Sequence, residues 1–176
     1  MEDKKSQILH KKSFMPKEIA EKIYDYAKSV DSEFTEFGNA EQEFKVFTGK
    51  GPASNTSEMF STINEYGKKV YDLVLETYGG SFVEYDPGKT HIARFEPGSK
   101  MHEHFDSSRP NDIATLIYIN DDYEGGEIYF PELELSIKPE AGDLVCFPDN
   151  PGFIHGVKEI SGFVRYTTPR WFTRIV

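Results

Sequence analysis

His104 and Asp106 are separated by a single residue, a spacing that can bind a metal ion. On a β-strand, residues i and i+2 project from the same face, so the His104 imidazole and the Asp106 carboxylate can point at one ion. His155, far along the chain, can supply a third ligand from another strand. Two histidines and one carboxylate cover one face of an octahedral metal and leave the opposite positions open. A His-x-Asp pair alone occurs by chance in many proteins, so its value depends on its surroundings.

The remaining histidines are weaker candidates. His102 shares strand parity with His104, so it is either a fourth ligand or a residue that lines the mouth of the site, and we favour the lining role. His91 reads as a surface or core position. His10 lies within a basic stretch that predicts a solvated N-terminal segment, formed by Lys4, Lys5, Lys11 and Lys12.

Arg165 lies in an otherwise poorly charged strand pattern, 163–172. Strand parity places it on one face with Phe163, Thr167 and Trp171. A buried arginine without an anionic partner is energetically costly. Two interpretations remain open: the guanidinium binds a ligand carboxylate through two hydrogen bonds, or it forms an internal salt bridge or lies exposed at a strand edge.

Tyr118 belongs to the segment 113–120, which is apolar on both faces and therefore predicts a central strand. A buried tyrosine hydroxyl needs a hydrogen-bond partner. That partner is either the same ligand carboxylate or a backbone carbonyl.

Two amphipathic helices must precede the strands. Apolar residues recur at helical spacing over 16–29 and again over 57–78, where Asn55 and Glu58 resemble a capping box. From Ser81 onward the period is two, and turn residues separate short segments. The pattern predicts strands near 82–85, 90–95, 102–106, 113–120, 127–130, 134–137, 144–147, 154–158 and 163–172.

This order of elements predicts an α+β fold, in which the two N-terminal helices pack on the outer face of one sheet. Many short strands at this spacing favour a sandwich or barrel, and a jelly roll is the natural closure. At 176 residues, we expect a single domain, 1–176, with helical support over 14–80 and a jelly-roll core over 81–176.

Composition excludes several classes of protein. The formal net charge is -10, which works against non-specific binding to nucleic acid. No segment approaches about 18 consecutive apolar residues, so no membrane span is expected. The N-terminal residues lack an apolar signal core, and the one cysteine, Cys146, fits a reducing compartment. We therefore expect a cytoplasmic protein.

Several motifs in order resemble the Fe(II)/2-oxoglutarate-dependent dioxygenases, and most of all their prolyl 4-hydroxylase-like branch. The resemblance covers roughly residues 80 to 176. It rests on the His104-x-Asp106 pair, the segments 116–121, 123–127, 139–148 and 155–157, and the closing pairs Arg165-Tyr166 and Trp171-Phe172.

The resemblance implies a double-stranded β-helix, which is another name for this jelly roll. It implies that His104, Asp106 and His155 bind Fe(II) and, with Arg165, make up the catalytic site. Arg165 and Tyr118 would bind the distal carboxylate of 2-oxoglutarate, and Trp171 would form a wall of that cosubstrate pocket. Dioxygen would be the second cosubstrate.

Two positions depart from the family pattern. Many relatives have a tyrosine before the Pro-Gly turn that precedes the metal motif, whereas this chain has Phe95 there. Several prolyl 4-hydroxylases use lysine where this chain has Arg165. The arginine keeps the charge but changes the geometry of the contact.

The expected function is hydroxylation of a prolyl residue in a peptide or protein, with the loops 31–55, 86–90 and 107–112 setting the substrate. The alternatives are a hydroxylase of a small free substrate and a cupin-like metalloprotein that binds metal without 2-oxoglutarate. In the cupin-like case His102 would be a ligand and Arg165 would be dispensable for ligand binding. A nucleic-acid demethylase of the same superfamily is disfavoured by the net charge.

Overall fold

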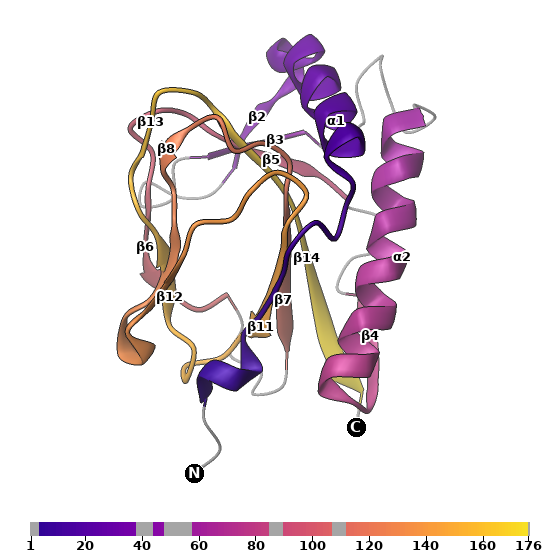
Figure 1. The fold of residues 1–176 in the computed structure, drawn as a ribbon, viewed down its shortest axis with the longest axis vertical. Coiled ribbons are helices and arrows are strands. Elements are labelled where there is room, and N and C mark those ends of the chain that lie inside the picture. The colour runs from indigo at the N-terminus through magenta and orange to yellow at the C-terminus, as the bar shows by residue number, and fades with distance from the viewer. Residues whose placement is uncertain (1–3, 38–43, 48–57, 85–89, 107–111, 176) are drawn as a thin grey trace.

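The structure is a computed structural model that describes residues 4–37, 44–47, 58–84, 90–106 and 112–175 (Figure 1). The described part of the chain begins with a short 3-10 helix, Lys4–Gln7, and a strand, β1 (Leu9–Lys11), before helix α1 (Lys17–Ser29). A second 3-10 helix, Asp31–Glu33, leads into β2 (Thr35–Phe37) and β3 (Phe44–Phe47). Helix α2 (Glu58–Tyr78) follows, and after it the chain is mainly strands.

The strands after α2 are short, apart from the last one. They are β4 (Ser81–Glu84), β5 (Ile92–Phe95), β6 (Met101–His104), β7 (Ile113–Tyr118), β8 (Glu124–Gly125), β9 (Ile128–Phe130), β10 (Leu135–Ile137), β11 (Leu144–Pro148), β12 (His155–Val157), β13 (Ile160–Ser161) and β14 (Arg165–Ile175). A 3-10 helix, Pro131–Leu133, separates β9 from β10.

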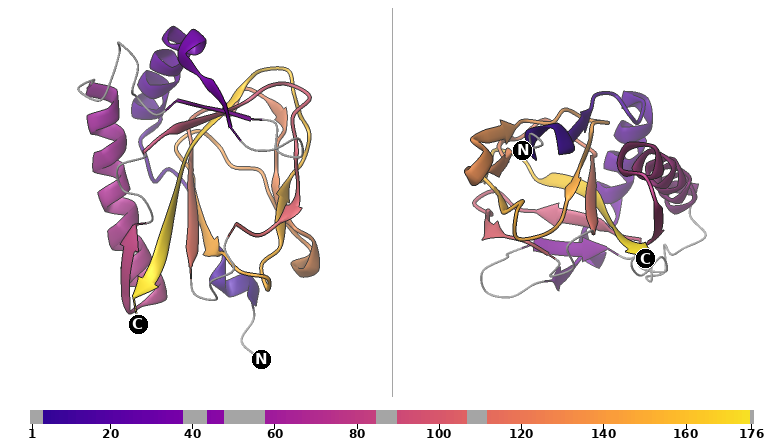
Figure 2. Two further views of the ribbon diagram at one scale, coloured as in Figure 1. Left: turned by 180° about the vertical axis from the view of Figure 1, so that it is seen from behind. Right: turned by 90° about the horizontal axis from the view of Figure 1, so that it is seen from below.

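Among the described residues the strands form two main antiparallel sheets and one small ribbon. The larger sheet has the order β1-β11-β7-β14-β5-β3-β2, and β4 also pairs with β14. The smaller sheet has the order β10-β9-β12-β6, and β13 pairs with β8. Figures 1 and 2 show the two sheets facing each other, with both helices outside the larger one. The predicted α+β double-stranded β-helix, with its helices packed on one sheet, is confirmed.

Alternation along the central strands separates two cores. One face of β7 places Ile113 and Ile117 among buried residues of α1 and α2, such as Ile23 and Val70. The opposite face places Tyr118 between the sheets, in a cluster with Ala114, Ile128, Phe130, Val145 and Phe147. The period of two thus gives the larger sheet a helix-covered outer face and an inner face that meets the smaller sheet.

The helices begin and end close to where the sequence predicts. Pro16 precedes α1, whose Ala20, Ile23 and Ala27 are buried on one face. The expected capping residue of α2, Asn55, lies outside the described residues. None of the described helices is long and apolar enough to span a membrane.

The N-terminal segment corrects one expectation. The sequence predicts a solvated terminus, yet Leu9–Lys11 forms β1 and pairs with β11 at the edge of the larger sheet. His10 is also not merely solvated, because its Nε2 lies 2.7 Å from Oδ2 of the buried Asp143. A partner that is distant in sequence orders this segment, and the local charge pattern does not reveal such a partner.

Candidate active site

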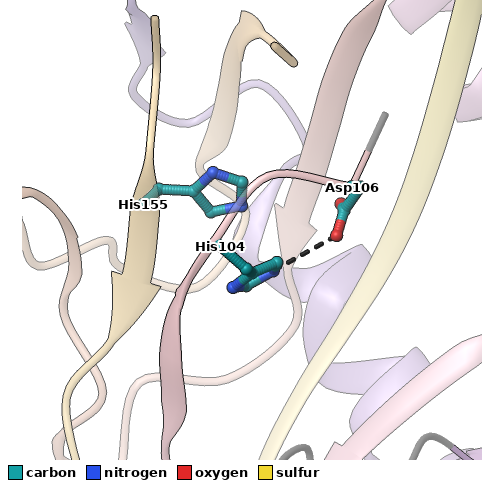
Figure 3. Close-up of side chains that lie close together, drawn as sticks. All are labelled: His104, Asp106 and His155. Atoms are coloured by element: carbon teal, nitrogen blue, oxygen red, sulfur yellow. Dashed lines mark ion pairs between the residues drawn. The ribbon is translucent and has the colours of Figure 1, made fainter. Parts of the chain in front are cut away.

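Three side chains meet at one end of the interior between the sheets. His104, Asp106 and His155 each offer a ligand atom, and these atoms all lie within 4.8 Å of one another (Figure 3). This is the only such group of three or more among the residues that the structure describes. Two imidazoles and one carboxylate are the donor set of a facial triad for Fe(II).

The smaller sheet sets the two histidines side by side. His155 begins β12 and is paired with His104, the last residue of β6, and the ring centroids are 4.6 Å apart. The strand expected over 102–106 ends at His104, so Asp106 lies beyond it on a bend. The buried Asp149 holds this bend, because its Oδ1 accepts a hydrogen bond of 2.9 Å from the Asp106 backbone N–H.

Backbone carbonyls fix the orientation of both histidines. His104 Nδ1 donates to the carbonyl of His102 at 2.6 Å, and His155 Nδ1 donates to the carbonyl of Phe153 at 3.1 Å. A ring that donates from Nδ1 keeps Nε2 for a metal. His102 therefore helps through its backbone, while its side chain is exposed and is not part of the group of three.

Burial and neighbouring charges tune the triad. Burial, assisted by the nearby His104, lowers the pKa of His155 to about 4, so His155 is neutral at neutral pH and its lone pair is available. Burial alone would raise the pKa of Asp106, but the hydrogen bond with His104 and the charges of both histidines hold it below its ordinary value. His104 Nε2 lies 3.2 Å from Asp106 Oδ1. A metal ion bound by His104 Nε2 and Asp106 Oδ1 would take the place of a proton between these two atoms.

Trp171 and His91 border the triad from the larger sheet and the segment before β5. Trp171 Nε1 donates a hydrogen bond of 2.8 Å to Asp106 Oδ2. The His91 ring is stacked on Trp171, with centroids 6.2 Å apart and an interplanar angle of 24°. Trp171 thus lies beside Asp106 of the triad, whereas the sequence gave no reason to place His91 against Trp171.

A second polar cluster lies at Arg165, on the inner face of β14. Arg165 is fully buried, with an exposed fraction of 0%, and none of its three guanidinium nitrogens has a hydrogen-bond partner among the described residues. Its Cζ lies 4.7 Å from the ring centroid of Phe95 and 5.1 Å from that of Tyr118. The internal salt bridge left open by the sequence is thus absent from the described part of the chain.

Three hydroxyl groups are likewise buried without a hydrogen-bond partner in the described part of the chain. They are the Oη atoms of Tyr118 and Tyr123 and the Oγ1 of Thr167. Burial raises the pKa of both tyrosines, and the positive charge of Arg165 opposes that rise. Buried polar groups are normally paired, so a cluster of one cation and several hydroxyls fits a bound carboxylate.

Asn120 positions the strand on which Arg165 lies. Its Nδ2 donates to the carbonyl of Val164 at 2.7 Å, and its Oδ1 accepts from the N–H of Tyr166 at 2.8 Å. One amide side chain therefore binds the backbone on both sides of Arg165. Phe163, which strand parity placed on the Arg165 face, instead precedes β14 and is 62% exposed.

The sequence did not assign roles to Asn120, Tyr123 or Thr167. Thr167 shares strand parity with Arg165, which is a signal that could have found it. Asn120 and Tyr123 lie in loop segments after β7, where no periodicity reports the direction of a side chain. Their placement depends on contacts with residues that are distant in the sequence.

Residues 90–173 match the family model of the 2OG-Fe(II) oxygenase superfamily. Human prolyl 3-hydroxylase 2 is 39% identical over 67 residues, which cover 35% of this chain and 10% of that relative. The chain thus spans about a tenth of the length of the curated relatives that it matches.

Two solved structures resemble this fold over nearly the whole chain. A prolyl-4-hydroxylase from Pseudomonas putida gives a TM-score of 0.74 at 16% identity, covering 97% of this chain and 94% of that one. A prolyl hydroxylase from Trichoplax adhaerens was solved with a peptide fragment of the hypoxia inducible factor oxygen degradation domain. It gives a TM-score of 0.77 at 14% identity, covering 96% of this chain and 84% of that one. Residues 90–173, which include the candidate triad, thus match the 2OG-Fe(II) oxygenase superfamily, and this match implies Fe(II) as the cofactor and 2-oxoglutarate and dioxygen as the cosubstrates.

Proposed function

We propose that this chain is a 2-oxoglutarate- and dioxygen-dependent hydroxylase that acts on a prolyl residue of a peptide or protein. The single observation that supports cosubstrate use most directly is the buried guanidinium of Arg165, which has no acidic partner among the described residues. It lies in the same interior as a group of side chains suited to Fe(II). A 2-oxo dicarboxylate has a 2-oxo acid end that can bind the metal and a carboxylate end that can bind Arg165.

The proposal assigns a role to each residue. His104, Asp106 and His155 bind Fe(II), Arg165 and Tyr118 bind the distal carboxylate of 2-oxoglutarate, and Trp171 forms a wall of the cosubstrate site beside the metal. When bound, Fe(II) with 2-oxoglutarate supplies the oxidation, in which one atom of dioxygen enters a substrate C–H bond as a hydroxyl and the other enters succinate, with release of carbon dioxide.

The protein itself orients the ligands and limits the access of water. His155 packs against the rings of Phe130 and Phe147, with centroids 5.9 and 4.6 Å away, so that side of the triad is dry. Phe105, which lies between the two ligands His104 and Asp106 in the sequence, is 41% exposed and therefore accessible next to the triad. An apolar side chain exposed at this point suits an apolar group such as a prolyl ring.

Prolyl hydroxylases are found by both the sequence and the structural comparison, and this supports the choice of substrate. The sequence similarity is to prolyl 3-hydroxylases and the fold similarity includes a prolyl-4-hydroxylase, so either C3 or C4 of the ring is a candidate position. The expected substrate loops 31–55, 86–90 and 107–112 lie largely outside the described residues.

The first experiment tests cosubstrate binding. The Fe(II)-loaded protein is titrated with 2-oxoglutarate without oxygen, and the visible metal-to-ligand charge-transfer band is followed. We expect a saturable band that is absent in His155→Ala. Bound iron without a band would favour a cupin-like metalloprotein that does not use 2-oxoglutarate, although the exposed His102 gives that alternative no support.

The second experiment tests the substrate. Proline-containing peptides are incubated with the enzyme, iron, 2-oxoglutarate and oxygen, and mass spectrometry follows the gain of one oxygen atom on proline. Asp106→Ala is the inactive control. If succinate forms and a free metabolite is oxidised while no peptide is hydroxylated, the substrate is a small molecule and not a prolyl residue.

A further inference from the structure

Tyr123 is a polar side chain near Arg165 to which neither the sequence nor the proposed function gives a role. It is 2% exposed, and its hydroxyl has no hydrogen-bond partner among the described residues. A tyrosine buried only for packing needs no hydroxyl, because phenylalanine fills nearly the same volume without the desolvation penalty. A buried hydroxyl without a partner in the described chain therefore points to a ligand.

The surroundings of Tyr123 fix its ring. A Cβ atom on Gly126, which has φ of +68°, would lie 2.8 Å from Tyr123 Cε2, so the ring packs directly on this glycine. Lys138 Nζ donates to the Tyr123 carbonyl at 3.1 Å and lies 4.2 Å from the centroid of its ring. The backbone and the ring of Tyr123 are thus both held by contacts within the chain.

Tyr123 and Phe95 belong to one apolar cluster with Ala93 and Ile160, and Phe95 is also the residue paired with Arg165 across β5 and β14. Phe95 contacts the guanidinium through its ring face but has no group that can bind an oxygen atom. Hydroxyl groups near Arg165 come instead from Tyr123, which shares the Phe95 cluster, and from Tyr118, whose ring lies against Arg165.

The electrostatics agree with this arrangement. The charge of Arg165 lowers the pKa of both tyrosine hydroxyls, and Tyr118 raises that of Tyr123. Burial is the main reason that the pKa of Tyr123 is raised to about 12. The hydroxyl therefore keeps its proton at neutral pH and can bind an anion by donating a hydrogen bond to it.

We infer that Tyr123 is a second hydroxyl ligand for the distal carboxylate of 2-oxoglutarate, acting together with Tyr118 and Arg165. A carboxylate has about four lone-pair sites, which a two-pronged guanidinium and two phenolic donors can fill together. Because these donors are preorganised, they favour a ligand that ends in a carboxylate over one that ends in a methyl group.

The test compares two ligands that share the metal-chelating end. 2-Oxoglutarate has the distal carboxylate, whereas 2-oxobutanoate ends in a methyl group. Dissociation constants are measured without oxygen by calorimetry on the Fe(II)-loaded protein, for the wild type, Tyr123→Phe, Tyr118→Phe and the double variant. The matched control is Tyr71→Phe, which removes a hydroxyl that donates to Phe82 O on the helix side of the sheet.

We expect Tyr123→Phe to weaken the binding of 2-oxoglutarate by about tenfold or more, which is the effect of losing one hydrogen bond to a charged group. Binding of 2-oxobutanoate and the melting temperature of the ligand-free protein should not change, and Tyr71→Phe should bind both ligands as the wild type does. Unchanged 2-oxoglutarate binding in Tyr123→Phe would overturn the inference, and so would equal weakening of both ligands, which would indicate a structural role.

The outcome for the wild type separates this inference from the proposed function. If the wild type prefers 2-oxoglutarate but Tyr123→Phe is unaffected, only the role of Tyr123 is wrong. If the wild type binds both ligands equally, the Arg165 cluster does not bind the distal carboxylate at all, and cosubstrate binding as proposed fails with it.

Discussion

Trp171 Nε1 donates a hydrogen bond of 2.8 Å to Asp106 Oδ2. Trp171 lies on β14 of the larger sheet, whereas Asp106 follows β6 of the smaller sheet. The bond therefore connects the two sheets at the proposed metal ligand, and it fixes the one ligand that is not on a strand. It also leaves the other carboxylate oxygen, Oδ1, directed at His104.

Replacing Trp171 by Phe should lower the affinity for Fe(II) by about tenfold to a hundredfold, the usual effect of removing an outer partner of a metal ligand. The physical reason is that the Asp106 carboxylate can then rotate. Anaerobic calorimetry with Fe(II) measures the change. An unaltered metal affinity would mean that the bend after β6 alone orients Asp106.

Replacing Arg165 by Met should weaken 2-oxoglutarate binding by roughly a hundredfold or more, since a buried charge pair is lost. Unlike most core substitutions, it should leave the ligand-free protein as stable or more stable, because a buried cation without an acidic partner in the described chain is removed. Thermal melting with and without 2-oxoglutarate measures both effects. Rescue of activity at high cosubstrate concentration is expected, and undiminished affinity would disprove the role of Arg165.

Replacing Asn120 by Ala should lower both stability and cosubstrate affinity. The carbonyl of Val164 and the N–H of Tyr166 would lose their partner, which costs about 1–3 kcal/mol for each buried group left unsatisfied. Chemical denaturation and 2-oxoglutarate titration measure the two effects. A loss of stability with no change in affinity would show that β14 keeps Arg165 in place without this amide.

Replacing Asp143 by Asn should destabilise the protein in a pH-dependent way. Burial alone would raise the pKa of Asp143, but the N–H groups of Glu140 and Ser13 and the side chain of His10 hold it below the ordinary value of 3.8. A lowered folded-state pKa contributes stability that is complete above the unfolded value and is lost as the pH falls through the folded value. The wild type should therefore exceed Asp143→Asn in unfolding free energy at pH 7, and the difference should shrink below about pH 4. A difference that stays constant from pH 7 to acid would contradict this account.

Replacing Gly67 by Ala should destabilise the packing of α2 on β14. A Cβ atom at this buried position would collide with the Arg170 guanidinium, which also binds Glu84 and Asn64. The expected cost is about 1–3 kcal/mol, although alanine is otherwise the better helix former by about 1 kcal/mol. Ser61→Ala, at an exposed position of the same helix, is the control and should be neutral or stabilising. Equal behaviour of the two variants would show that Arg170 moves aside without cost.

The sequence by itself determined the class of fold and the three residues of the triad. Helical spacing followed by a period of two depends on neighbouring residues alone, so it can be read directly. The spacing of His104 and Asp106, the late His155 and the isolated charge of Arg165 are equally local. The structure brings the triad together as expected, even though Asp106 lies on a bend and not on the strand.

Only the tertiary structure decided which polar groups are left without partners in the interior. Among the residues that the structure describes, the hydroxyls of Tyr118, Tyr123 and Thr167 have no hydrogen-bond partner, and this depends on the packing of segments that are far apart in the sequence. The same is true of Trp171 on Asp106, Asn120 on the backbone beside Arg165, and β1 on β11. Hydrogen bonding and burial depend on which residues are close together in space. The sequence alone does not show which of its distant residues come into contact.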